Sequence, residues 1–426
     1  MSTIAEELRE LTKAVSDNPG GGGSSLGKHI YGVEWGTNSE NDNDCIETEG
    51  MRIDESANFS DPVPYVDGDQ TSLVRCGSPF DNLYPWSEMK IVKDKVADMV
   101  AIPKFWYKWS RDEENLGDYG LRLQIATYAA EGFSLAPAFR ARNANDTERD
   151  VVYIARYKCG GVLGTGYTNQ MPVVDMSRAQ FRTAVSTGMA QYGFTGYSLQ
   201  DYAMFWTWRM LFLVEYATWN GQAAIGYNCG GEVCSTCGGT GGVGGAECSE
   251  CGGSGVMAPE GPENTGTTNS MPYHTGTMAA SLDTPSQGVQ YRYIEDPWGG
   301  VAEWIDGWYR SGDNISYGCN IILDPTDFSD TENGVNIGEL PQNSGWISGW
   351  TIPSADGYDW ALIPRTDGTT SQDGTDGVAD VCGFDGPALG CGGAWDAHPY
   401  YGAFGLSSLD ASYAYDGIGA RLQKLP

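Results

Sequence analysis

Four cysteines in two matched clusters offer the clearest chemistry in this chain of 426 residues. Cys234 and Cys237 are separated by two residues, Cys248 and Cys251 repeat that spacing, and a Gly-Gly pair follows each cluster. Four thiolates on two tight turns suit a tetrahedral Zn²⁺ ion. No histidine lies beside them in the sequence, so nothing there indicates a catalytic zinc with an open coordination position. We therefore expect one structural Zn²⁺ in an insert over residues 229–256, with two disulfides as the alternative.

The doubled pattern resembles the cysteine-rich zinc modules of J-domain co-chaperones, with two copies where that family has four. Cys229 is a spare possible ligand. The chain has 11 cysteines, and an odd number cannot all pair, which disfavours a framework of disulfides. We expect assembly in a reducing cytoplasm.

Histidine and lysine are too scarce to support most other chemistry. The three histidines, His29, His274 and His398, are far apart in the sequence, and no lysine occurs between Lys158 and Lys424. A phosphate-binding Gly-Lys-Ser/Thr loop and a Schiff-base lysine are therefore absent from that stretch. Carboxylate pairs could bind Ca²⁺ or exchange protons, although solvation is their more ordinary role in a chain with 56 acidic residues. These pairs are Asp42 with Asp44 and Glu303 with Asp306.

The net charge excludes further classes of function. Twenty-five basic residues against 56 acidic ones give a formal charge of −31, which repels phosphate backbones and anionic lipid. The most apolar stretch, Ala203 to Trp219, is interrupted by Arg209 and Glu215 and is shorter than the ~20 residues of a spanning helix. We expect neither nucleic-acid binding nor membrane insertion.

The first residues predict a helix followed by a linker. Ile4, Leu8, Leu11 and Val15 repeat at heptad spacing, so residues 1–17 are expected to form an oligomerisation or docking helix. A frayed amphipathic tail is the alternative, because so short a helix is unstable alone. The Gly/Ser-rich residues 18–28 then form a flexible tether.

The remaining pattern predicts an α+β fold. Short apolar runs between turn residues indicate a β-rich domain over 29–150, with a strand near 99–109 and another at 151–157. Capping signals predict a helix from Ser177 to about Tyr192 and a second, core helix from Ser198 to near Asn220.

Several C-terminal segments resemble the formylglycine-generating-enzyme-like domains. Residues 296–309, D-P-W-G-G-V-A-E-W-I-D-G-W-Y, are similar to that family's G-N-V-W-E-W-x-x-D-x-Y segment. Gly392-Gly-Ala-Trp395 and Gly419-Ala-Arg-Leu422 are similar to its closing G-G-S-W and G-F-R-L strands. The resemblance implies a C-type-lectin-like domain over 151–426 that contains the cysteine insert. The enzymes of the family carry a close cysteine pair where Ala411 to Asp416 has none, so we expect no catalytic activity.

The chain also looks like a second branch of this fold, the variable proteins of diversity-generating retroelements, including those that set phage tropism. Their variable positions lie between a G-G-x-W and a G-A-R strand and arise by mutagenesis of adenines. Residues 396–416 contain no Lys, Glu, Gln, Met or Trp, which randomised Asn codons cannot encode, although this absence could arise by chance. They are rich in Tyr, Ser, Gly and Asp, as binding surfaces are, although the tyrosines could instead pack the core. The resemblance implies a ligand-binding set of Asp396, Ala397, His398, Tyr400, Tyr401, Gly405, Ser407, Ser408, Leu409, Asp410, Tyr413, Tyr415 and Asp416.

The first half is similar to tail-tip or minor tail proteins of phages and prophages of gut bacteria, on residues 79–86, 102–107 and 133–139. We therefore expect a homotrimeric adhesin of the phage tail, assembled in the host cytoplasm, that contacts other tail proteins and binds a protein or glycan receptor on the bacterial surface. One alternative is a formylglycine-generating-like oxidase using Cys382 and Cys391. Another is a non-diversified lectin that binds sugar through Trp346, Trp350 and Trp360.

Overall fold

The computed structural model describes ten stretches of the chain and several short pieces between residues 232 and 257. Strands predominate, and the described part holds four α-helices, so the expected α+β class is confirmed. The stretches are residues 27–38, 45–67, 76–160, 168–226, 262–278, 288–312, 317–331, 333–366, 380–394 and 401–426.

One five-stranded antiparallel sheet comes entirely from the first half of the chain. Its strand β9 alternates buried Leu121, Leu123 and Ile125 with partly exposed Arg122 and Gln124, because successive side chains of a strand point to opposite faces. The order is β10 (Ser134–Leu135), β8 (Trp106–Ser110), β9 (Leu121–Ala126), β1 (Ile30–Trp35) and β4 (Met51–Asp54).

A second sheet joins the two halves of the chain. Strand β11, which begins at Val151, pairs with β7 on one side and with the last strand, β30, on the other. A single large core cluster also includes residues from both halves. The regions expected as separate domains, 29–150 and 151–426, therefore share a sheet and a hydrophobic core. The order is β12 (Tyr197–Leu199), β30 (Arg421–Lys424), β11 (Val151–Lys158), β7 (Asp98–Pro103) and β6 (Lys90–Lys93).

The C-terminal third forms a seven-stranded mixed sheet with smaller ladders beside it. The seven strands, in order, are β25 (Ile363–Thr366), β24 (Gly345–Thr351), β26 (Val381–Phe384), β28 (Leu406–Leu409), β27 (Ala388–Cys391), β20 (Ala302–Ile305) and β29 (Ile418–Gly419). The smaller sheets are β21 (Trp308–Ser311), β22 (Gly318–Ile321) and β23 (Val335–Glu339); β19 (Ile294–Glu295), β18 (Val289–Tyr291), β17 (Gly276–Thr277) and β5 (Tyr65–Val66); and β2 (Thr37–Asn38) with β3 (Cys45–Ile46).

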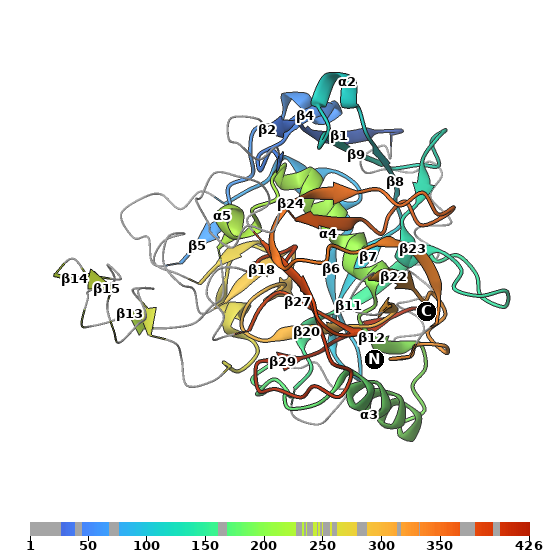
Figure 1. Cartoon of the computed structure of the whole chain (residues 1–426), viewed down its shortest axis with the longest axis vertical. Helices are drawn as coiled ribbons and strands as arrows, with labels where there is room; N and C mark the ends of the chain where they lie inside the picture. The colour runs from blue at the N-terminus through green and yellow to red at the C-terminus, as the bar shows by residue number, and fades with distance from the viewer. Residues whose placement is uncertain are drawn as a thin grey trace.

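Helix α4 (Tyr202–Tyr216) lies in the middle of the molecule with strands around it, whereas α3 (Arg178–Gln191) lies at the lower edge in Figure 1. All 15 residues of α4 are buried, as the sequence predicts for a core helix. Its cap is Asp201, which accepts the backbone N–H of Met204 at 2.8 Å, and not Ser198, which belongs to β12. The other helices are α2 (Glu113–Leu116) and α5 (Gly221–Ile225).

Helix α3 follows its predicted bounds closely. The Ser177 side chain accepts the backbone N–H of Gln180, and the Gln180 side chain accepts the backbone N–H of Ser177 at 2.8 Å. This reciprocal capping box satisfies two donors that the first turn leaves without helical partners. No helix in the part of the chain that the structure describes is long and apolar enough to cross a membrane.

Candidate functional site

Two of the three C-terminal segments on which the expected family resemblance rests, 296–309 and 419–422, meet in a buried ion pair. Arg421, from the G-A-R strand, donates to Glu303 Oε1 through Nε at 3.0 Å and through Nη2 at 2.8 Å. Lys158 of β11 approaches the same oxygen at 3.1 Å. Burial by itself raises the pKa of Glu303, but Arg421 and Lys158 outweigh it and leave that pKa below its ordinary value. Glu303 is therefore a structural carboxylate held between two cations.

Arg421 also ties separate strands together through their carbonyl groups. Its Nη1 donates to the carbonyl oxygens of Ala155 at 3.0 Å and Arg156 at 2.8 Å, and its Nη2 donates to those of Glu295 at 2.7 Å and Asp296 at 2.9 Å. A planar guanidinium presents five donors in a fixed geometry, which this site uses fully. The closing motif thus fixes the last strand within the core.

The other acidic residue of the motif fixes α3. Asp306 accepts from Arg182 Nε at 2.9 Å and Nη2 at 2.7 Å, while Arg178 pairs with Asp330 at 2.7 Å. Glu303 and Asp306 therefore have separate cationic partners and do not form the Ca²⁺ pair considered from sequence. Within the described residues, no group of three or more His, Cys, Asp or Glu side chains is arranged to hold a metal ion.

The tryptophans considered for sugar binding are core residues. Trp350 and Trp360 are at most 1% exposed, and Trp346 is 8% exposed. Trp350 packs edge-on against Trp206 of α4, with ring centroids 5.3 Å apart. Their faces are therefore covered by protein, and a sugar has no access to them in this structure.

The two cysteines considered for oxidation chemistry are also buried. Burial raises the pKa of Cys382 and raises that of Cys391 to about 12, so both remain protonated thiols at neutral pH. A thiolate, not a thiol, is the reactive nucleophile and metal ligand. Neither residue has the environment of a reactive cysteine.

The predicted ligand residues fall into three groups. Asp396, Ala397, His398 and Tyr400 lie outside the described residues. Gly405 and Ser408 are buried, which leaves them no surface for a macromolecular ligand in this conformation. The remaining seven residues are at least partly accessible, and they are Tyr401, Ser407, Leu409, Asp410, Tyr413, Tyr415 and Asp416.

The exposed part of this set is a compact loop over residues 410–416. Asp410 Oδ1 accepts the backbone N–H of Ser412 at 2.8 Å and its hydroxyl at 2.6 Å, and these hydrogen bonds lower the pKa of Asp410. The rings of Tyr413 and Tyr415 have centroids 6.0 Å apart, and Tyr413 is 39% exposed. The loop thus presents an aromatic side chain and carboxylates from an ordered turn.

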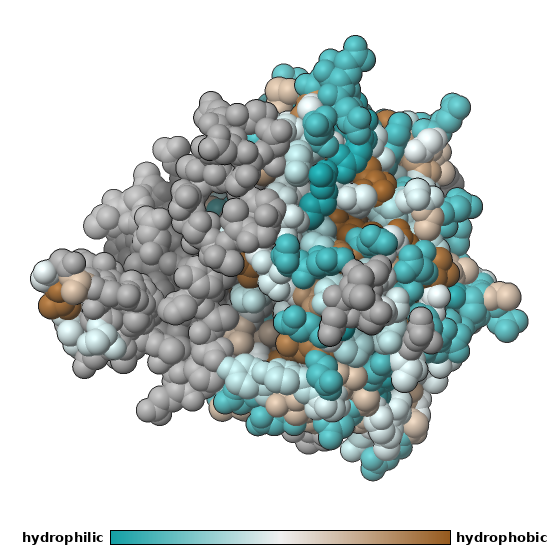
Figure 2. All heavy atoms as spheres, viewed as in Figure 1, coloured by the Kyte–Doolittle hydropathy of each residue, from teal (hydrophilic) through white to brown (hydrophobic). Residues whose placement is uncertain are grey.

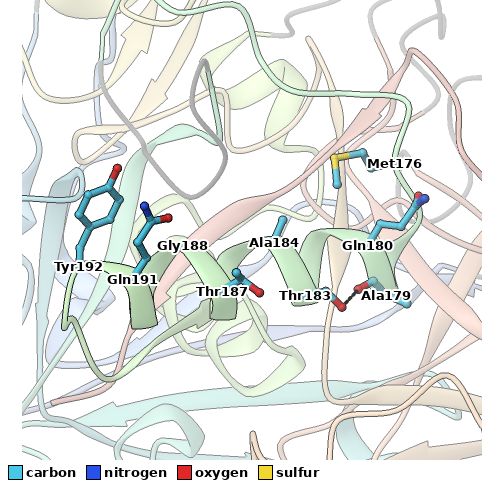
Figure 3. Close-up of a pocket in the computed structure, with 9 residues that line it drawn as sticks. All are labelled: Met176, Ala179, Gln180, Thr183, Ala184, Thr187, Gly188, Gln191 and Tyr192. Carbon is cyan, nitrogen blue, oxygen red and sulfur yellow. Dashed lines mark hydrogen bonds between the residues drawn. The ribbon is translucent and has the colours of Figure 1, made fainter.

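A shallow groove of about 630 Å³ runs along α3 and begins beside this loop. Figure 3 shows Met176 and Tyr192 at its two ends, and the backbone N–H of Asp175 donates to the carbonyl of Tyr415 at 3.1 Å. None of the lining residues is charged. The described surface that faces the viewer in Figure 2 is largely hydrophilic, with small hydrophobic areas. Sequence reasoning missed this groove, because the small residues along α3 gave no distinctive signal. The nine lining residues are Met176, Ala179, Gln180, Thr183, Ala184, Thr187, Gly188, Gln191 and Tyr192.

The four cysteines predicted to bind zinc, Cys234, Cys237, Cys248 and Cys251, lie outside the described residues. Two short ladders are described within the insert. Strand β13 (Glu232–Val233) pairs with β16 (Val256–Met257), and β14 (Gly242–Val243) pairs with β15 (Ala246–Glu247). The zinc site therefore remains a prediction from the thiolate set.

No protein-family model matches this chain, and no curated protein matches it.

Proposed function

We propose that the chain is a phage tail adhesin, a non-enzymatic variable protein of a diversity-generating retroelement, whose segment 396–416 recognises a receptor on the bacterial surface. The observation that carries the proposal is the ordered, exposed loop 410–416 on a rigid buried frame. Tyrosine offers large contact area at low entropic cost, and small polar residues offer adaptable hydrogen bonds. The loop has the chemistry of a binding surface.

The arrangement of strands and helices supports a C-type-lectin-like frame. Strand β11 and the last strand, β30, are antiparallel neighbours, although they lie about 260 positions apart in a chain whose α3 and α4 fall between them. Glu303 and Arg421, which carry the resemblance, form one buried pair. These residues would keep the frame constant while the surface loop changes.

The geometry gives the two alternative functions less support. The buried thiols of Cys382 and Cys391 disfavour an oxidase, and the buried rings of Trp350 and Trp360 disfavour sugar binding at that place. Binding through the C-terminal loop needs neither group. A homotrimer on a tail would amplify weak single contacts, since avidity can exceed single-site affinity by roughly 10²–10⁴.

Adsorption to bacterial cells tests this proposal. The full chain is coupled to beads, so that many copies face the cell, and bead retention is measured on a panel of gut bacterial isolates. We expect retention on a subset of strains and its loss in the double variant Tyr413→Ala, Asp416→Ala.

Met51→Ala is the control, because Met51 is 63% exposed and lies on β4, in the sheet formed by the first half of the chain. Retention on no strain, or equal retention of wild type and the double variant, would count against the adhesin.

A further inference from the structure

A buried carboxylate holds the backbone in the middle of the predicted ligand segment. Asp380 Oδ1 accepts the backbone N–H of Gly402, and Oδ2 accepts that of Phe404 at 2.9 Å. A Cβ at position 402 would lie 2.9 Å from Oδ1 and 3.1 Å from Gln222 Cγ, so glycine allows the close approach. Each oxygen of the buried carboxyl group thus accepts one backbone donor of this segment.

An arginine from the central helix holds the carbonyl between those two amides. Arg209 Nε donates to the carbonyl of Ala403, and its guanidinium carbon lies 3.5 Å from the ring centroid of Phe205 and 4.0 Å from that of Trp208. Burial lowers the pKa of Arg209 to about 10, so it stays charged at neutral pH. The backbone of residues 402–404 is therefore hydrogen-bonded by Asp380 and by Arg209.

The side chain of Phe404 completes this attachment. Its ring lies 4.9 Å from Trp219 and 6.3 Å from Trp350 between centroids, and it is fully buried. Residues 402–406 are all buried, whereas Asp410, Ser412, Tyr413 and Asp416 are exposed.

We propose that Asp380 and Arg209 are positioning residues that hold 402–406 as a fixed anchor next to the exposed loop 410–416. The anchor fixes the backbone from which the chain continues into the loop 410–416. This inference rests on the proposed function for its ligand, but its geometry can be tested without one. It also removes Gly405 from the residues expected to contact the receptor.

The surroundings of Asp380 make the anchor sensitive to pH. Arg209 of α4 is the charged group that acts on the Asp380 carboxylate. Two thiols lie nearby: Cys391 interacts with the Arg209 guanidinium, and Cys382 of β26 follows Asp380 by two residues in the sequence. Burial raises the pKa of Asp380 to about 7, although its two backbone hydrogen bonds and Arg209 act in the opposite direction. Because the pKa of Asp380 is higher in the folded state than its ordinary value, protonation of Asp380 stabilises the anchored state. This stabilisation is complete below about pH 4 and is lost as the pH rises through 7.

Amide hydrogen exchange of the full chain tests the anchor directly. In Asp380→Ala we expect exchange at least about tenfold faster over residues 401–406, with α4 and β11 unchanged, since one decade corresponds to a single lost hydrogen bond of ordinary strength. Asp385→Ala is the control, because Asp385 is an exposed carboxylate five residues away. Asp380→Asn keeps an acceptor and should restore part of the protection.

The pH profile separates positioning from a general loss of stability. After correction for intrinsic exchange rates, protection over 401–406 should fall in wild type from pH 5 to about pH 7.5 and stay constant in Asp380→Asn. Unchanged exchange in Asp380→Ala, or equal acceleration throughout the chain in both Asp380 variants, would overturn the inference. If beads carrying the wild-type chain bind no cells, the proposed adhesin function is refuted. The hydrogen-exchange experiment would still test the anchor, because it needs no ligand.

Discussion

Arg421 and Glu303 lie 118 positions apart in the sequence and form an ion pair at 2.8 Å in which both side chains are at most 5% exposed. Each belongs to one of the three short C-terminal segments that carry the lectin-like resemblance expected from the sequence. Their common role is to join the last strand to β20 and β11, not to contact a ligand. Both residues are buried, whereas most of the loop 410–416 is exposed.

Removing the charge of Glu303 should destabilise the whole chain. Glu303→Gln leaves Arg421 and Lys158 buried beside a neutral amide, and the loss of one partner of a buried pair typically costs about 3–5 kcal/mol. Urea denaturation at pH 7 measures the change in the free energy of unfolding. Glu131→Gln, on an exposed turn, should change it by less than about 0.5 kcal/mol. A cost for Glu303→Gln as small as that control would refute the structural role.

Asp81 should contribute stability that is lost in acid. Burial alone would raise the pKa of Asp81, but hydrogen bonds from His274 at 2.9 Å and from the backbone N–H of Ser78 at 3.0 Å outweigh it and lower the pKa to about 2. A folded-state pKa below the ordinary value gives stability that is present above about pH 4 and disappears between pH 4 and 2.

The free energy of unfolding of Asp81→Asn should therefore be roughly 2 kcal/mol lower than that of the wild type at pH 7. This difference should disappear as the pH falls to 2. Denaturant titrations at several pH values measure it, with the exposed Asp356→Asn as control. A difference that is constant from pH 7 to pH 2 would contradict the assigned pKa.

The anchor and the exposed loop should respond differently to loss of an aromatic ring. Phe404→Ala empties space against Trp219 and Trp350 and should cost about 3–5 kcal/mol, whereas Tyr413→Ala should stay within about 0.5 kcal/mol. Thermal and urea unfolding of both variants give the comparison. Equal losses at the two positions would mean that Tyr413 packs the core.

The cysteine insert should bind metal. Protein purified without chelator should contain about one Zn²⁺ per chain, because the four thiolates complete a tetrahedral set. Elemental analysis measures this content, and Cys237→Ser with Cys251→Ser should abolish it, whereas Cys76→Ser, at an exposed free cysteine, should not. Finding no zinc in the wild-type protein would rule the site out.

Local sequence signals predicted individual helices, but not which distant strands pair. The capping box at Ser177 and the apolar run around Phe212 located α3 and the buried α4, because both signals act within one or two turns. The pairing of Val151–Ala155 with Met99–Pro103, across the boundary expected after residue 150, was not predicted, because it depends on a sheet formed over long sequence distance. Local composition carries no information about such pairing.

The candidate site shows the same limit. The composition of 396–416 pointed to its exposed tyrosine and carboxylates, but composition could not separate Asp410 on the surface from Ser408 in the core. Asp380 and Arg209 were not expected, because their partners are backbone groups of Gly402, Ala403 and Phe404, and backbone contacts leave no pattern in side-chain types.

Sequencing this locus in many members of the population is the most direct test of the central claim that 396–416 is a diversified binding surface. Substitutions should be concentrated within codons 396–416, should spare the buried anchor 402–406, and should match adenines in a nearby template copy. Substitutions spread evenly along the chain, with no template nearby, would contradict a diversified binding surface.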